Sequence, residues 1–203
     1  MKINKNVYIL LENLKAYSLE TYNHSIEVSK LCTLFGRYLG LSNEEIDKLR
    51  LAGLLHDIGK LCIPLKILHK PSALTKEEFN ILKIHPLYSV KLLIQADFTC
   101  YDVLSIIINH HEKINGLGYP YGLDDSSIPD LAKILAICDS YDAMKSKRVY
   151  KDAKNTNYIK EELINNACKQ FDYYYVNMFL DYLNLMDNKK RFCLSNNLLV
   201  SSM

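Results

Sequence analysis

The chain has 203 residues, and 49% of them are apolar, which is enough to build one sizeable hydrophobic core. Its 25 basic and 23 acidic residues nearly balance, so the composition excludes a strongly basic surface for a nucleic-acid polymer and an acidic tail. No apolar run reaches the ~20 residues of a membrane helix, and the six cysteines form no CxxC pair. We therefore expect a cytoplasmic single-domain protein, with no membrane partner, whose cysteines are reduced core residues.

Helical periodicity runs through most of the chain, and no alternating strand pattern interrupts it. A short lead helix is expected over residues 6–20. The next marked helix, over residues 42–57, begins with Ser42 and Glu45 at the spacing of a capping box. This helix should stop near Gly59, because glycine commonly follows a helix C-terminus.

The middle of the chain carries two further helix signals. A helix over residues 74–84 begins with Thr75 and Glu78, again at the spacing of a capping box. It should end before Pro86, which cannot continue the hydrogen-bond ladder, so His85 lies at a junction between two helices. Residues 101–111 read as a buried helix that ends in two histidines. Both helix ends therefore carry ionisable side chains beside apolar segments.

A glycine-rich loop separates the middle of the chain from its last helices. Residues 114–123 hold three glycines and a proline, a composition that favours a loop. A largely buried helix should follow over residues 130–144, and Asp172 is placed to cap a final helix over residues 173–186.

These elements predict an all-α bundle. We assign residues 1–187 to one domain that includes the short lead helix, and residues 188–203 to a C-terminal tail of uncertain structure.

Histidines and carboxylates accompany the apolar runs. A single histidine in such a place is more often a hydrogen-bonded core residue than a ligand. Here Glu20 precedes His24 by four residues, so one helix face presents both side chains to a common cation. Asp57 follows His56 directly, and Asp139 interrupts the apolar helix over residues 130–144. The repeated pairing of imidazole and carboxylate favours a metal site.

The types of ligand atom indicate which metals would bind and which reaction they would support. Adjacent helical residues diverge by about 100°, so His110 and His111 serve one site only if it lies at the helix end. Five imidazoles and three carboxylates without a thiolate favour two or three borderline divalent ions such as iron or manganese, whereas structural zinc usually shows cysteines. Such ions activate water and polarise phosphoryl oxygens, which makes phosphoester hydrolysis the candidate reaction. The set comprises Glu20, His24, His56, Asp57, His85, His110, His111 and Asp139.

Two motifs carry a family resemblance. The stretch LLHDIGK spans residues 54–60, and HHEKINGLGYP spans residues 110–120. With the HP pair at 85–86 and DSYDAM at 139–144, they make the chain resemble the HD superfamily of metal-dependent phosphohydrolases, and within it the HD-GYP family of cyclic di-GMP phosphodiesterases. The resemblance extends from about residue 20 to residue 179. It implies an HD-domain-type helical bundle with a GYP loop over a buried metal site.

The resemblance also implies roles for individual residues. It implies that Asp57 bridges two ions, and that Glu20 holds a third ion as it does in some family members. Lys60 matches a lysine that contacts the scissile phosphate, and we count it with Asp57 as catalytic. The implied metal ligands are Glu20, His24, His56, Asp57, His85, His110, His111 and Asp139. The implied substrate-binding residues are Gly118, Tyr119, Pro120, Asp142, Arg148 and Lys151.

Five positions depart from the family pattern. Asn115 stands where an aspartate is usual, and Ile114 stands where a large aromatic is common. Asp125 replaces a glycine, Val149 replaces a proline, and Ser89 is the small residue after the HP pair. None of these departures removes an expected ligand, but they affect the shape of the loop and with it substrate affinity and product pattern.

The expected function is hydrolysis of cyclic di-GMP to linear pGpG, with GMP as a further product. Two alternatives stay open. One is a weakly active or inactive module that binds a cyclic dinucleotide or a protein partner of unknown identity. The other is an HD hydrolase of a related cyclic dinucleotide such as cyclic GMP-AMP.

Overall fold

The computed structural model describes residues 3–146 and 154–200, with side chains as far as residue 188. Within these ranges the chain forms helices joined by short loops, and its only β-structure consists of two isolated bridges. The all-α bundle is therefore confirmed. The α-helices are α1 (Lys5–Tyr17), α2 (Leu19–Tyr38), α3 (Asn43–Leu55), α4 (Leu65–Leu68), α5 (Lys76–Leu82), α6 (His85–Gln95), α7 (Tyr101–Asn109), α8 (Asp130–Lys145), α9 (Thr156–Asn166) and α10 (Tyr173–Val200). The 3-10 helices are η1 (Ile58–Cys62) and η2 (Asp125–Ser127).

Helix starts follow the capping signals in the sequence. The hydroxyl of Ser42 accepts a hydrogen bond from the Glu45 backbone N–H, and the Glu45 side chain accepts one from the Ser42 backbone. The same capping box forms between Thr75 and Glu78 at the start of α5. These reciprocal bonds satisfy backbone donors that have no partner within the helix, which is why both predicted starts are confirmed.

The expected lead helix over residues 6–20 forms as α1, but it ends at Tyr17 because the chain breaks at Ser18. Ser18 adopts an extended conformation that ends α1, and its hydroxyl accepts a hydrogen bond from the Thr21 N–H to cap α2. Glu20 and His24 therefore belong to the first two turns of α2, a helix that is packed into the bundle.

Other boundaries also differ from the sequence expectation. Helix α7 ends at Asn109, so both histidines that follow lie at or beyond its end. Helix α10 continues to Val200, through most of residues 188–203, which the sequence assigns to a tail of uncertain structure. Of the cysteines expected in the core, Cys32 and Cys138 are buried there, whereas Cys62 and Cys168 are exposed.

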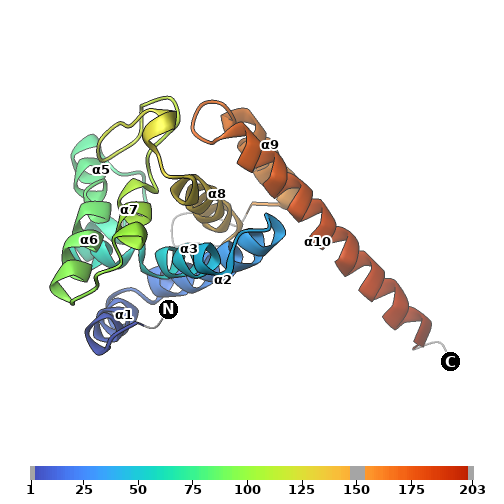
Figure 1. The fold of residues 1–203 in the computed structure, drawn as a ribbon, viewed down its shortest axis with the longest axis horizontal. Coiled ribbons are helices and arrows are strands. Elements are labelled where there is room, and N and C mark those ends of the chain that lie inside the picture. The colour runs from blue at the N-terminus through green and yellow to red at the C-terminus, as the bar shows by residue number, and fades with distance from the viewer. Residues whose placement is uncertain (1–2, 147–153, 201–203) are drawn as a thin grey trace.

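The helices pack around one apolar core. Helix α2 lies against α3 and α8, α3 also contacts α7, and α8 contacts α9 and α10 (Figure 1). Phe35 of α2 is fully buried and meets the ring of Phe179 of α10 edge-on, with 4.9 Å between ring centroids. Tyr141 of α8 contacts Phe179 in the same way at 5.2 Å. These aromatic contacts join the first and last parts of the domain.

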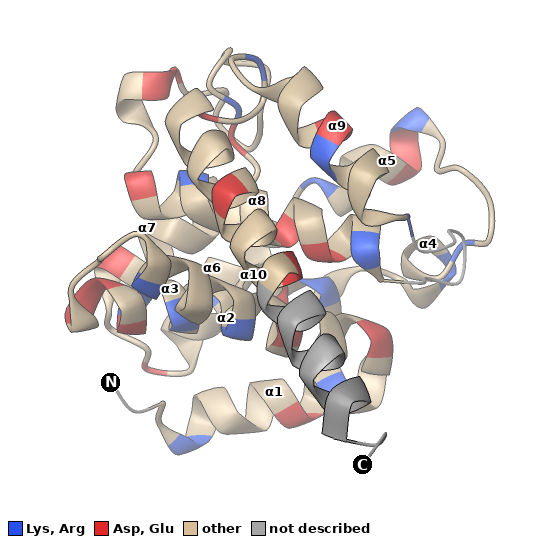
Figure 2. Ribbon diagram, turned by 90° about the vertical axis from the view of Figure 1, so that its right-hand side faces the viewer, with Lys and Arg blue, Asp and Glu red and all other residues tan. Residues whose placement is uncertain are grey.

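Charged residues of both signs are interspersed over the helices (Figure 2). This pattern agrees with the balanced composition and shows no extended stripe of one sign. In the part of the chain that the structure describes, no helix combines the length and the apolar character that a membrane crossing requires.

Because Gly59 has no side chain, the backbone of η1 contacts the backbone at the start of α6. Its N–H donates a hydrogen bond to the Ser89 hydroxyl, with 2.8 Å between nitrogen and oxygen. A Cβ atom at this position would lie 2.0 Å from the His85 carbonyl oxygen and 2.4 Å from the Ser89 nitrogen. Only glycine fits such a gap, and this approach places Asp57 next to His85.

We expect the substitution Gly59→Ala to lower the free energy of unfolding by about 1–3 kcal/mol or more, because η1 and α6 must separate to admit the methyl group. Urea denaturation measures the change. The matched control is Gly36→Ala inside α2, where the new Cβ would meet side chains at 3.4–3.5 Å and should gain about 0.5–1 kcal/mol from helix propensity. A Gly59→Ala protein within about 0.5 kcal/mol of the original would contradict the packing described here.

Candidate metal centre

Five segments of the bundle bring seven of the expected metal ligands to one place. They are α2, the α3–η1 junction, the start of α6, the end of α7 and the middle of α8. Three overlapping groups of these side chains each present ligand atoms within 4.8 Å of one another. The groups are His85, His110 and His111; His24, His56 and Asp57; and His56, His110 and Asp139.

Asp57 lies at the centre of this arrangement and is 1% exposed. Its Oδ1 atom lies 3.3 Å from Nε2 of His85, while its Oδ2 atom lies 3.4 Å from Nε2 of His56 and 3.8 Å from Nε2 of His24. Lys60 Nζ donates a hydrogen bond to Oδ2 at 2.6 Å. The two carboxylate oxygens therefore face different imidazoles: Oδ1 faces His85, and Oδ2 faces His56 and His24.

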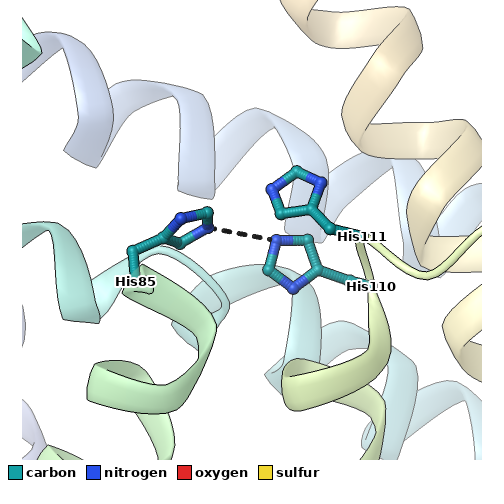
Figure 3. A group of neighbouring side chains, drawn as sticks. All are labelled: His85, His110 and His111. Atoms are coloured by element: carbon teal, nitrogen blue, oxygen red, sulfur yellow. Dashed lines mark hydrogen bonds between the residues drawn. The ribbon is translucent and has the colours of Figure 1, made fainter. Parts of the chain in front are cut away.

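Three imidazoles are oriented by the backbone of the turn that precedes them. In each, Nδ1 donates to the carbonyl oxygen three residues earlier, which turns Nε2 toward the shared site. The pairs are His56 with Gly53 at 2.9 Å, His85 with Leu82 at 2.9 Å, and His110 with Ile107 at 2.5 Å. Figure 3 shows His85 reaching His110 from the opposite side, with His111 beside it.

His24 is oriented by a carboxylate instead of a carbonyl. Its Nδ1 atom lies 2.6 Å from Oδ2 of Asp142, and its Nε2 atom lies 2.9 Å from Oδ1 of Asp139. Burial alone would lower the pKa of His24, but the hydrogen bonds to Asp139 and Asp142 outweigh it and raise that pKa. Asp142, which we expected to bind substrate, thus lies in contact with His24.

The protonation states of His85, His110 and Asp57 suit metal binding. Burial lowers the pKa of His85 to about 3 and that of His110 to about 4, so both imidazoles are neutral at physiological pH. Burial would raise the pKa of Asp57, but the neighbouring His56 and Lys60 hold it well below its usual value. Neutral imidazoles and ionised carboxylates are the forms that bind divalent metals.

Two buried polar atoms at the centre make no hydrogen bond. They are Nε2 of His56 and Oδ1 of Asp57. An unsatisfied buried polar atom costs about 1–3 kcal/mol, and more for a charged group, so this pair needs an explanation. His56 lies beside Oδ2 of Asp57, whereas Oδ1 lies beside His85. A cation on each side of the carboxylate would satisfy both atoms, and the residues present therefore fit a site for more than one metal ion.

A cavity of about 310 Å³ opens onto the cluster. The side chains of His24, His85, His111 and Asp139 line it on the cluster side. Glu20 also lines the cavity but does not belong to the three tight ligand groups, so its role as an additional ligand stays a prediction.

Lys60 and Tyr119 face the same cavity. The Tyr119 ring stacks on His111 with 4.6 Å between centroids, and the Tyr119 backbone N–H donates to the His111 carbonyl oxygen. Burial raises the pKa of Tyr119, so its phenol stays protonated and able to donate. A Cβ at Gly118 would lie 2.3 Å from the Lys113 nitrogen, and Pro120 follows Tyr119 through a cis peptide bond.

Sequence reasoning missed Glu112, which organises the glycine-rich loop. Its carboxylate is buried and accepts hydrogen bonds from the backbone N–H groups of Tyr121 at 2.7 Å, Gly122 at 3.2 Å and Leu123 at 3.0 Å. Because Glu112 follows His111 directly, the end of α7 and the loop form one unit. The sequence signal for this role is the position of Glu112, an acidic residue just before a loop whose backbone N–H groups need an acceptor.

The departures from the family pattern also have local partners. The Asn115 side chain accepts a hydrogen bond from the Leu117 N–H, and Asp125 forms an ion pair with Lys133 at 2.6 Å. The Ser89 hydroxyl donates a hydrogen bond to the His56 carbonyl oxygen at 2.6 Å and accepts one from the Gly59 N–H. Ser89 therefore connects α6 to the α3–η1 junction. The expected substrate-binding residues Arg148 and Lys151, and the departure Val149, lie outside the described residues.

The chain is similar to a known protein family and to several named proteins. A family model described as HD domain matches residues 9–173. A cyclic di-GMP phosphodiesterase of Pseudomonas aeruginosa is 40% identical over 150 residues, which are 74% of this chain and 36% of that protein. A 3′3′-cGAMP-specific phosphodiesterase of Vibrio cholerae is 37% identical over 177 residues, or 87% of this chain and 34% of that protein.

A solved structure described as a HDG"Y"P protein from Bdellovibrio bacteriovorus superposes with a TM-score of 0.67 at 22% identity, over 80% of this chain and 52% of that one. At this identity the match supports the fold alone. The chain spans about a third of the length of the two curated relatives.

We expect the substitution Glu112→Gln to loosen the glycine-rich loop, since an amide offers one acceptor oxygen where the carboxylate offers two and the remaining bonds lose their charge assistance. Hydrogen–deuterium exchange of the backbone amides of residues 121–123 should become at least about tenfold faster, while α2 stays protected. Asp124→Asn is the matched control, because it removes the same charge from an exposed position of the same loop. Unchanged exchange in the Glu112→Gln protein would show that the carboxylate does not hold the loop.

Proposed function

Because this chain belongs to the HD-domain family and, within it, to the HD-GYP group, we propose that it is a metal-dependent phosphodiesterase that hydrolyses cyclic di-GMP. The observation that carries the proposal is Asp57, a buried carboxylate whose two oxygens face different imidazoles beside an open cavity. This arrangement supports the proposal that Asp57 bridges two divalent ions.

The relatives support the substrate class. Several are named cyclic di-GMP phosphodiesterases, and others are named 3′3′-cGAMP-specific phosphodiesterases. Both substrates contain two phosphodiesters that join two purine nucleotides. We favour cyclic di-GMP for this chain, and cyclic GMP-AMP is the second candidate because it appears in the names of relatives of similar identity.

The donor set supports iron or manganese as the metals. It combines imidazole nitrogens with carboxylate oxygens and contains no thiolate, which suits borderline divalent ions. When bound, such ions supply an activated water and stabilise charge on the phosphoryl oxygens. In our proposal, His24, His56, His85, His110, His111, Asp57 and Asp139 hold two ions, and Glu20 holds a third where one is present.

The residues around the cluster have separate tasks in the proposed reaction. Lys60 Nζ lies at the cavity wall, 2.6 Å from Asp57, where its positive charge would stabilise the negative charge that develops on the phosphoryl group. Tyr119 keeps its proton and donates a hydrogen bond to the bound nucleotide. Asp142 keeps His24 in the orientation that points Nε2 at the site.

The first product would be linear pGpG. In-line attack of water on one phosphorus would form a new P–O bond and break the bond to the ribose 3′-oxygen, which would leave with a proton from the water, while the second diester would stay intact. A second round of cleavage would give GMP. The alternative of an inactive binding module is less well supported, because the imidazoles and carboxylates expected of a working site all lie at the cluster or on the cavity wall beside it.

The test is an assay of purified protein loaded with iron(II) or manganese(II) under reducing, anaerobic conditions. We expect conversion of cyclic di-GMP to pGpG, at a higher kcat/KM than the conversion of cyclic GMP-AMP. Chromatography of the products measures both reactions. No turnover of either dinucleotide by metal-replete protein would contradict the proposed function, and tight binding without turnover would favour the binding module.

The substitution Asp57→Asn should lower kcat at least about a thousandfold, because the amide cannot bridge two ions through two anionic oxygens. Elemental analysis should show the accompanying loss of metal. Asp181→Asn, at an exposed position of α10, is the matched control and should keep both activity and metal content. Equal activity of the two variants would contradict the role assigned to Asp57.

A further inference from the structure

The cavity has a second wall that the proposed reaction does not yet use. This wall is formed by Ile67 of α4, by the segment that joins α4 to α5, and by Leu82 of α5. In the connecting segment, His69, Lys70, Ser72 and Leu74 line the cavity. None of the residues assigned to metal, catalysis or substrate above lies on this wall.

Short contacts at both ends hold the wall in place. The Tyr17 hydroxyl donates to the Ile63 carbonyl oxygen at 2.7 Å, just before α4. At the other end Lys70 forms an ion pair with Glu78, a residue that the capping box already fixes at the start of α5. The wall is therefore preformed, and a ligand that binds there loses little free energy in ordering it.

The chemistry of the wall differs from that of the cluster side. The cluster side presents the carboxylates Glu20 and Asp139, whereas the described residues that line the second wall include no carboxylate. Lys70, His69 and Ser72 offer hydrogen-bond donors, and Figure 2 shows basic residues along α4 and the connection to α5. Ile67, Leu74 and Leu82 add an apolar surface. Donors beside an apolar surface suit a phosphate attached to a flat nucleobase.

A cyclic dinucleotide has two phosphates, and only one can lie at the metal cluster in a given turnover. We propose that the second wall binds the half of the cyclic dinucleotide that is not being cut. Lys70 and His69 contact the intact phosphate, and the apolar side chains of Ile67, Leu74 and Leu82 contact the attached base. This inference rests on the proposed function and extends it to the recognition of the dinucleotide as a whole.

The test measures binding separately from cleavage. The probe is the bisphosphorothioate analogue of cyclic di-GMP, in which one sulfur on each phosphate slows hydrolysis, titrated into the metal-loaded full chain by calorimetry. Lys70→Gln should raise the Kd of this analogue roughly ten- to hundredfold, as expected for the loss of a charge-assisted hydrogen bond. The same variant should lower kcat/KM for bis(p-nitrophenyl) phosphate far less, because this small diester has no second nucleotide to reach the wall.

Two control variants separate phosphate binding from mere support of the segment. Glu78→Gln breaks the same ion pair but keeps the Lys70 charge, and Lys66→Gln removes an equal charge from an exposed position of α4. Both should bind the analogue within about twofold of the unsubstituted protein. The glutamine of the Glu78→Gln variant still offers an oxygen to the Thr75 backbone N–H, so the start of α5 keeps its capping box.

The outcomes distinguish this inference from the proposed function. Equal weakening by Lys70→Gln and Glu78→Gln would overturn the subsite, and so would an unchanged Kd in Lys70→Gln or a lack of analogue binding by the unsubstituted protein. An equal loss of small-diester turnover in Lys70→Gln would also overturn it. If the protein binds the analogue with the expected pattern but cleaves no dinucleotide, the subsite stands and the proposed hydrolysis fails.

Discussion

The structure depends on one electrostatic constraint, the burial of the Asp57 carboxylate. A carboxylate that is 1% exposed must be compensated by positive charge or by hydrogen bonds, because desolvation of an ion is expensive. Lys60 compensates one oxygen, and the other has no hydrogen-bond partner. The surrounding imidazoles are oriented with their Nε2 atoms toward this carboxylate, so a cation shared between them relieves the constraint.

The bundle is organised to hold that arrangement. The backbone contact between Gly59 and α6 brings the α3–η1 junction against His85. The Ser89 hydroxyl joins the two elements, because it accepts a hydrogen bond from the Gly59 N–H and donates one to the His56 carbonyl oxygen. On the other side, Glu112 binds three backbone donors of the glycine-rich loop and holds Tyr119 over His111. The clustered imidazoles and the glycine-rich loop are thus parts of one connected framework, the kind of preorganised arrangement that favours catalysis.

The sequence predicted the helices whose starts carry local signals, such as the capping boxes at Ser42 and Thr75, because such signals act within one turn. It also predicted that histidines and carboxylates from separate helices would gather. It did not predict the break at Ser18, since the apolar pattern runs on through it. The sequence did not predict the role of Glu112 either. The conformation of the loop decides which backbone N–H groups lie near the carboxylate, and that conformation depends on tertiary packing.

The most direct test of the central claim is anomalous X-ray diffraction from crystals of protein prepared without oxygen, recorded at the iron and manganese edges. Our account predicts at least two anomalous peaks, about 3.5–4 Å apart, on either side of the Asp57 carboxylate and within reach of the Nε2 atoms that surround it. A map without a peak at Asp57, from protein given either metal in excess, would contradict it.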